Sequence, residues 1–214
     1  CNGDTFSTVS PVDGTNGDVV PTGTTYSWIA PVSNPANVVT GGSSGTDQGS
    51  IVGQTLSNVT SSPATLTYTV TPTSADDCAG TPFTVTITVN PEPQINNVTE
   101  TICNGDTFST VSPVDGTNGD VVPTGTTYSW VIASTSSSDI DGGVGGSGSS
   151  IPGTLLTNNS TTNPLDLIYV VTPTSAEGCD GSDFTVTITV NPTADMNLAS
   201  SQVVCNGDLT TVDF

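Results

Sequence analysis

The segment Phe83-Thr84-Val85-Thr86-Ile87-Thr88-Val89 recurs without change as residues 184–190. Its apolar side chains occupy every second position and its threonines occupy the positions between, which predicts a strand with one buried face. The segment Leu66-Thr-Tyr-Thr-Val70 alternates in the same way. A stretch with Pro, Asp and Gly separates the two segments, so we expect an antiparallel hairpin with a long loop.

The hairpin belongs to a longer repeat. Residues 103–130 are identical to residues 1–28, and a further copy begins at Cys205, which gives a period of 102 residues. A period of this size corresponds to one small domain. We therefore expect three units: 1–91 as a repeat without its leading strand, 92–192 as a second repeat, and 193–214 as the start of a third. Proline-bearing segments at 90–94 and 191–195 predict short, semi-rigid linkers.

Each repeat carries about seven candidate strands and no convincing helical period, and one Trp lies in a strand pattern. This predicts an all-β fold of tandem immunoglobulin-like sandwiches that together form a rod. Trp28 and Trp130 are expected in the core, with sugar stacking as the alternative. The glycine runs at 41–45 and 142–148 are interpreted as flexible loops. The predicted core residues are Tyr26, Trp28, Phe83, Val85 and Ile87 in the first repeat, and Tyr128, Trp130, Phe184, Val186 and Ile188 in the second.

Composition limits the possible functions. The 214 residues include no Lys, Arg or His, against 20 Asp and Glu, so the formal charge is −20. Nucleic-acid binding depends on Lys and Arg and is not expected. Catalysis through His or Lys is excluded, and we predict that the chain is not an enzyme. The apolar stretches are too short to span a membrane, so no membrane insertion is expected in this segment.

Five cysteines occur at regular positions, an early and a late one in each full repeat. Pairing within repeats joins Cys1 to Cys78 and Cys103 to Cys179, and leaves Cys205 unpaired in this sequence. The alternative joins consecutive repeats through Cys78–Cys103 and Cys179–Cys205. Either arrangement favours an oxidising compartment, and we expect an extracellular, cell-surface location.

The Asn-Gly-Asp motifs are the remaining candidates for a site. Asn-Gly favours tight turns, and carboxylate and amide oxygens are also calcium ligands. The spacing matches no complete calcium loop. We expect no cofactor, with calcium as the alternative at Asp13, Asn16 and Asp18 and at their copies Asp115, Asn118 and Asp120.

Four motifs in fixed order carry a resemblance to a known family. They are Ile102–Phe108 (ICNGDTF), the TTYSW segments, Tyr68–Gly80 (YTVTPTSADDCAG), and the FTVTITVNP runs before each linker. Together they resemble the PKD-like and immunoglobulin-like repeats of very large surface proteins in Bacteroidetes. Such proteins look like adhesins exported by the type IX secretion system, including those of gliding motility. The resemblance implies a secreted, mechanical or adhesive role and transfers no catalytic residue.

We therefore expect a structural segment of a large surface adhesin or filament, whose partners are neighbouring repeats of the same chain. One alternative is a module that binds glycans or surface proteins by avidity through residues 29–62, which differ between the copies. Drift in tolerant loops explains that difference equally well. Another alternative is a subunit that polymerises by strand donation, with residues 193–204 as the spare strand.

Overall fold

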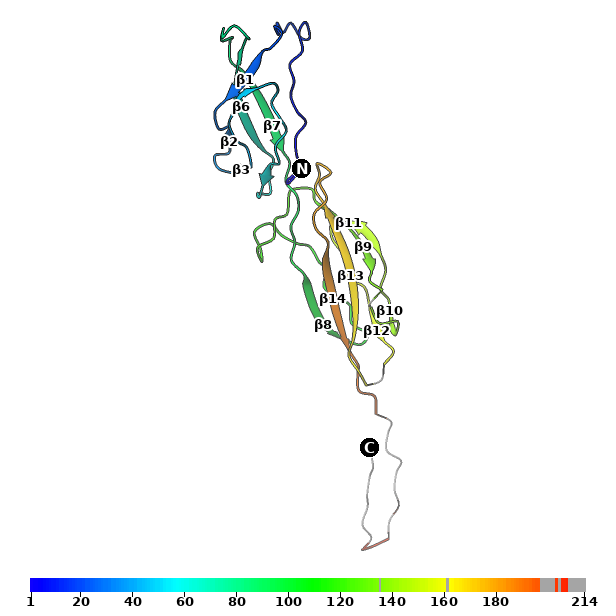
Figure 1. The fold of residues 1–214 in the computed structure, drawn as a ribbon. Coiled ribbons are helices and arrows are strands. Elements are labelled where there is room, and N and C mark those ends of the chain that lie inside the picture. Colours follow the sequence, from blue (N-terminus) through cyan, green and yellow to red (C-terminus); the bar gives the residue numbers. More distant parts are fainter. Residues whose placement is uncertain (135, 161, 197–202, 204, 208–214) are drawn as a thin grey trace.

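The computed structural model describes residues 1–134, 136–160, 162–196, 203 and 205–207. Two β-sandwiches lie end to end and give an elongated molecule, with a linker passing between them (Figure 1). The described residues contain no helix. The predicted fold class, all-β with tandem sandwich repeats, is confirmed.

In the first repeat, the main sheet forms around one long central strand. The strand β6 pairs with β7 on one edge, and with β1 and then β2 on the other, while β4 extends the sheet beyond β1. The predicted hairpin is confirmed, because Leu66, Tyr68 and Val70 lie opposite Ile87, Val85 and Phe83. The strands of this repeat are β1 (Thr25–Trp28), β2 (Val32–Asn34), β3 (Val39–Thr40), β4 (Gly45–Gln48), β5 (Ser57–Asn58), β6 (Ala64–Thr73) and β7 (Phe83–Val89).

The second repeat has the same plan with one additional strand. Its main sheet has the order β11-β9-β13-β14-β8, and β8 runs parallel to β14. The expected leading strand of this repeat is thus present as β8. The strands are β8 (Val98–Cys103), β9 (Thr127–Ile132), β10 (Ile140–Asp141), β11 (Gly146–Gly148), β12 (Thr157–Asn158), β13 (Leu165–Thr174) and β14 (Phe184–Asn191).

A less regular layer covers the inner face of each main sheet. In the first repeat it consists of the β3–β5 pair and of two single bridges, Thr5–Thr55 and Val9–Ile51. Ile51 and Leu56 from this layer are buried against Tyr68 of the sheet. The second repeat repeats this arrangement with the β10–β12 pair. The core of each repeat therefore lies between one regular sheet and one layer held by isolated bridges.

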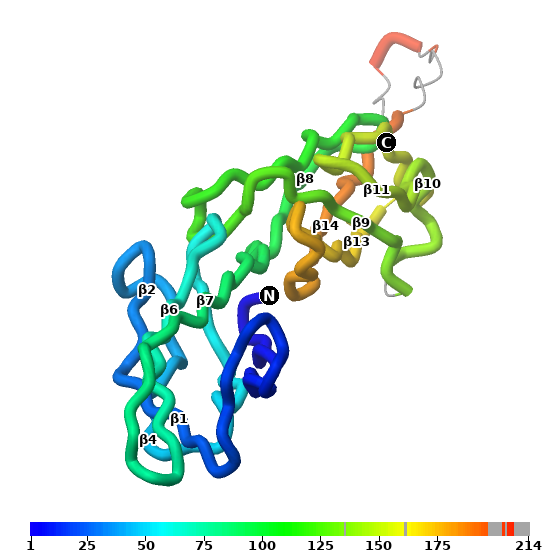
Figure 2. The backbone as a smooth tube through the Cα atoms, turned by 90° about the horizontal axis from the view of Figure 1, so that it is seen from above, coloured from blue at the N-terminus to red at the C-terminus, as the bar shows by residue number. Residues whose placement is uncertain are grey.

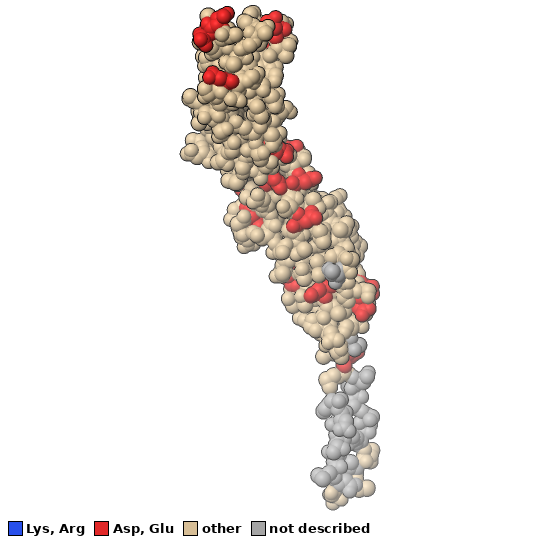
Figure 3. All heavy atoms as spheres, viewed as in Figure 1, with Lys and Arg blue, Asp and Glu red and all other residues tan. Residues whose placement is uncertain are grey.

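The tube view shows the two repeats as separate bodies that meet near the N-terminus of the chain (Figure 2). Acidic side chains are spread along the visible face of the molecule (Figure 3). No helix among the described residues is long and apolar enough to cross a membrane.

Candidate functional site

The two cysteines of one repeat lie at opposite ends of its sandwich. In the second repeat Cys103 lies opposite Asn191, at the end of β14, whereas Cys179 lies in the loop just before Phe184, at the start of β14. An eight-residue strand spans about 26 Å, and a disulfide requires Cα atoms within about 7 Å. Pairing within the repeat is therefore sterically impossible in this fold.

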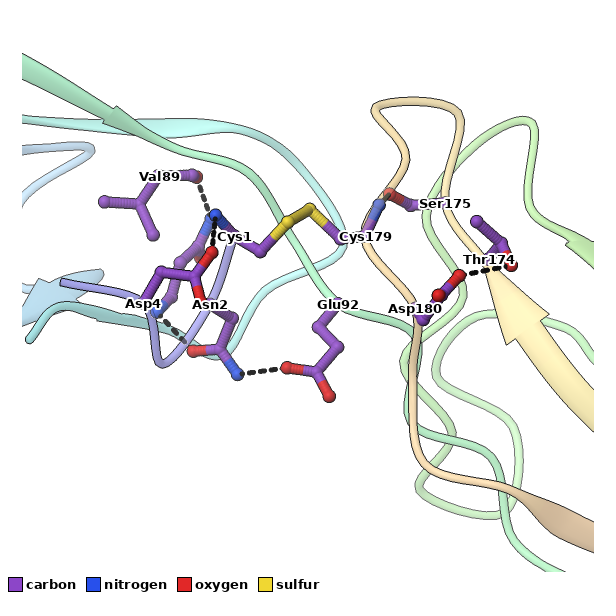
Figure 4. Close-up of a disulfide and its surroundings, with 10 residues drawn as sticks. Cys1, Asn2, Asp4, Val89, Glu92, Thr174, Ser175, Cys179 and Asp180 are labelled. Carbon is purple, nitrogen blue, oxygen red and sulfur yellow. Dashed lines mark hydrogen bonds and ion pairs between the residues drawn. A yellow bond between two sulfur atoms is a disulfide. The ribbon is translucent and has the colours of Figure 1, made fainter. Parts of the chain in front are cut away.

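The structure instead joins the early cysteine of the first repeat to the late cysteine of the second. Cys1 and Cys179 form a disulfide with their Cα atoms 5.6 Å apart (Figure 4). The expected pairs Cys1–Cys78 and Cys103–Cys179 are therefore wrong. The alternative pairs Cys78–Cys103 and Cys179–Cys205 are also wrong, because they join ends of the repeats that do not meet. Among the described residues, the unpaired cysteines are exposed: Cys78, Cys103 and Cys205.

The loop that carries Cys179 is ordered by its own hydrogen bonds. The Cys179 backbone N–H donates to Ser175 Oγ at 3.2 Å, and the Ser175 N–H donates to the Cys179 carbonyl at 2.9 Å. Thr174 Oγ1 donates to Asp180 Oδ1 at 2.7 Å. Cys179 is only 1 % exposed. The loop thus holds its sulfur in one place and covers it against the first repeat.

The early cysteine is held by the residue that follows it. Asn2 Oδ1 accepts the Asn58 N–H at 2.9 Å, and Asn58 Nδ2 donates to the Val89 carbonyl at 2.9 Å. Asn2 Nδ2 also donates to Glu92 of the linker at 3.3 Å (Figure 4). These bonds fix Cys1 beside the end of β7, where the chain leaves the first repeat.

Two further contacts close the junction between repeats. Gly181 lies so close to the linker that a Cβ atom at this position would collide with the Pro93 carbonyl oxygen. Gln94 exchanges backbone hydrogen bonds of 2.9 and 2.8 Å with Val121. The linker is therefore packed against the second repeat over several residues and does not behave as a free tether.

A polar contact crosses the junction at Asp115. Its carboxylate accepts the Val122 N–H at 2.9 Å and the Ser61 hydroxyl of the first repeat at 2.8 Å. The backbone hydrogen bond from Val122, and then the one from Ser61, hold the pKa of Asp115 below its ordinary value. Both bonds favour the charged form, so the junction includes a carboxylate that is stabilised as an anion.

The proposed calcium residues lie in turns. Asn16 and Asn118 have φ values of 54° and 56°, the left-handed conformation that Asn tolerates in turns. Asp13 accepts the Val20 N–H at 2.8 Å, and Asp120 accepts the Asn96 N–H at 2.9 Å. Over the described part of the chain, no group of three or more His, Cys, Asp or Glu side chains could hold a metal ion. Calcium binding by these turns stays a prediction.

The structure places both tryptophans in the cores. Trp28 and Trp130 are each 6 % exposed, and their indole N–H groups donate to the carbonyls of Ser43 and Val144. Gly45 and Gly146 lie directly on the indole rings, where a Cβ would collide. Parts of the two glycine runs therefore form strands that cover the tryptophans of the core. The prediction that the runs are flexible loops is wrong at these positions. Of the other predicted core residues, Tyr26, Tyr128, Phe184, Val186 and Ile188 are buried, and Phe83, Val85 and Ile87 are partly buried.

Several residues of the junction were not expected from the sequence, namely Asn58, Ser61, Pro93 and Gly181. The one available signal was positional. The late cysteine directly precedes the last predicted strand, so it lies at the start of that strand. The position of the early cysteine beside the other end of the strand comes from the structure.

These features define a tandem β-sandwich repeat protein whose distinctive site is the disulfide-linked contact between consecutive repeats. The family model of the PKD-like domain matches residues 1–93 and again residues 100–194. The chain therefore belongs to the PKD-like domain family. No curated protein matches the sequence.

Proposed function

We propose that this chain is a load-bearing segment of a large extracellular adhesin or surface filament, and that its repeats supply reach and stiffness. The observation that carries the proposal is the Cys1–Cys179 bridge, which joins two consecutive sandwiches covalently at their contact. A module that only displays a ligand-binding surface does not need such a bond.

The family and the chemistry support an extracellular setting. PKD-like domains form a family of extracellular, adhesion-type repeat modules that are generally non-catalytic, and the chain matches that family twice. A disulfide between domains persists in oxidising compartments. The finer assignment, a gliding-motility adhesin of Bacteroidetes exported by type IX secretion, rests on the sequence resemblance. In this proposal the partners of the segment are its neighbouring repeats, and glycans or surface proteins bind elsewhere on the filament.

The bridge changes how tension passes through the molecule. Cys1 and Cys179 are 178 positions apart, so a force applied at the two ends of the chain crosses the bridge and bypasses nearly all of both sandwiches. At a maximum of about 3.5 Å per residue, the bypassed segment represents about 60 nm of extended chain. Unfolding either sandwich therefore does not lengthen the oxidised molecule by this amount.

Single-molecule stretching of the chain by its two ends tests the proposal. The reduced protein, or the Cys179→Ser variant, should lengthen in two unfolding steps that total about 60 nm, whereas the oxidised protein should show neither step. The Cys78→Ser variant retains the bridge and is the matched control. Two full unfolding steps in the oxidised protein would overturn the load-bearing role.

Strand donation stays an alternative from the sequence. Its suggested donor, residues 193–204, lies largely outside the described residues. Concentration-dependent assembly that persists in Cys78→Ser and Cys103→Ser variants would support this alternative.

A further inference from the structure

The bonded cysteines and the unpaired ones occupy equivalent positions in the repeat. Cys103 follows Cys1 by one period of 102 residues and begins the same Cys-Asn-Gly-Asp motif. Cys78 and Cys179 both precede the last strand of their repeat by five residues. Each full repeat therefore carries one cysteine of each kind, and only one of each kind is bonded in this chain.

The loop around Cys78 already has the geometry of the bonded loop. The Cys78 N–H donates to Ser74 Oγ at 3.3 Å, and the Ser74 N–H donates to the Cys78 carbonyl at 3.0 Å. The Gly80 N–H donates to the Pro72 carbonyl at 2.8 Å, as the Gly181 N–H does to that of Pro173. Since the two loops share these bonds, the loop conformation does not depend on the disulfide. Cys78 differs from Cys179 in being exposed.

The surroundings of Cys103 match those of Cys1 equally well. Asn104 Oδ1 accepts the Asn158 N–H at 2.8 Å, and Asn158 Nδ2 donates to the Val190 carbonyl at 2.7 Å. The Gly105 N–H donates to the Leu156 carbonyl at 2.9 Å, as the Gly3 N–H does to that of Leu56 at 2.8 Å. Both halves of the observed junction are thus present a second time, one at each far end of the two-repeat unit.

We propose that Cys103 bonds to the late-loop cysteine of a following PKD-like repeat, and that Cys78 bonds to the early cysteine of a preceding one. The inference rests on the load-bearing function above and extends it from one junction to every junction of an array. The two thiols lose two protons and two electrons and form one S–S bond. The electrons reduce a disulfide oxidant to two thiols by thiol–disulfide exchange.

The resulting bridges overlap along the chain. The bridge from Cys1 reaches Cys179, and the next early cysteine, Cys205, lies only 26 positions further on. A covalent path through two repeats then contains 26 residues of backbone, which extend to no more than about 90 Å. Two sandwiches placed end to end, each built on ten-residue strands of about 33 Å, already span about 66 Å when folded. An array with every bridge formed can therefore lengthen by only about a third, even where a sandwich unfolds.

A longer chain that keeps the repeat spacing of 102 residues tests the proposal. Residues 1–204 are joined to a second copy of residues 1–214, so that Cys1 of the second copy takes the place of Cys205. Cys78 of the first copy and both Cys103 and Cys205 of the second copy are replaced by Ser. The protein is oxidised in a glutathione buffer, cleaved after Asp and Glu, and mapped by mass spectrometry without reduction.

The expected product links the peptide 101–106 of the first copy to the peptide 78–92 of the second, in addition to the Cys1–Cys179 bridge within each copy. In the matched control, Cys78 of the second copy is also Ser, and Cys103 should then react fully with a maleimide. Free Cys103 and Cys78 beside intact Cys1–Cys179 bridges would overturn this inference and leave the two-repeat rod standing. Absence of the Cys1–Cys179 bridge would remove the basis of both proposals.

A mixture of separate, unfused 214-residue chains under the same oxidant tests whether the partner cysteine can also come from another molecule. Chains linked through Cys103 and Cys78 would show that separate copies form the junction as well. Monomers there, together with the bridge in the fused chain, would assign the junction to consecutive repeats of one chain.

Discussion

Strands β7 and β14 share the sequence Phe-Thr-Val-Thr-Ile-Thr-Val but differ in burial. In β14 the apolar side chains are at most 2 % exposed, whereas Phe83, Val85 and Ile87 of β7 are only partly buried. The difference follows from the parallel partner β8, which pairs with β14 over six residues and brings Val98 and Ile102 against the core. The sequence of a strand thus determines which face turns inward, and its neighbours determine how completely that face is covered.

The largest effect should appear when the same core residue is truncated in the two strands. Ile188→Ala should lower the free energy of unfolding of the second repeat by about 4 kcal/mol, because the side chain is fully buried. Ile87→Ala should cost the first repeat about half as much, because its side chain is already partly solvated. Each repeat has one tryptophan, so denaturation followed by fluorescence in Trp28→Phe or Trp130→Phe backgrounds measures each repeat separately. Equal losses would show that β8 contributes little to the difference.

A second pair of substitutions should affect both repeats alike. Asn58 and Asn158 are 1 % and 4 % exposed, and they donate to the carbonyls of Val89 and Val190, near the end of the last strand of each repeat. Replacement by Ala leaves buried backbone groups without partners, at a cost of about 2 to 3 kcal/mol in either repeat. The same fluorescence assay measures both changes. A loss confined to one repeat would mean that the two sandwiches are anchored differently.

The junction should be sensitive to one added methyl group at Gly181 and tolerant of the same change at Gly80. A Cβ at Gly181 meets the Pro93 carbonyl, whereas a Cβ at Gly80 meets only Pro72. Gly181→Ala should therefore reduce the equilibrium yield of the Cys1–Cys179 bridge several-fold in a glutathione buffer, and Gly80→Ala should leave the yield unchanged. Quantification of the linked peptide measures both variants. A normal yield in Gly181→Ala would indicate that the linker does not position the loop.

The smallest effect should be electrostatic. The folded state lowers the pKa of Asp115, so its contribution to the junction is present above the pKa of the unfolded chain and is lost as the pH falls through the lowered value. Ser61→Ala removes one of the two stabilising hydrogen bonds and should raise the pKa of Asp115 toward its ordinary value. Ser61→Thr keeps the hydroxyl and should preserve the lowered pKa. Titration of the carboxyl carbon by NMR tests this, and an unchanged pKa in Ser61→Ala would place the whole effect on the Val122 N–H.

The sequence was sufficient to predict the elements that have a strong alternating pattern. Alternating segments predicted the β6–β7 hairpin and its inward face, and the repeat of 102 residues predicted two equivalent sandwiches. The strands of segment 29–62 were harder to predict, because β3 and β5 have only two residues each and form through their pairing with each other. Gly45 carries no pattern that reveals its contact with Trp28, since that contact joins residues far apart in the chain.

The cysteine pairing illustrates the same limit at the level of the site. One early and one late cysteine per repeat suggest a pair within the repeat, and composition contains nothing against it. The length of β14 excludes that pair, and the direction in which consecutive sandwiches stack brings Cys1 to Cys179. Predicting a disulfide between domains therefore requires knowledge of how the domains are arranged, and short sequence patterns do not encode that arrangement.

Disulfide mapping of the 214-residue chain tests the account most directly. Cleavage after Asp and Glu without reduction should yield the peptide 1–4 linked to the peptide 178–180, with Cys78 and Cys103 recovered as free thiols. Recovery of 1–4 linked to 78–92, together with 101–106 linked to 178–180, would contradict it and place each bridge inside a single repeat.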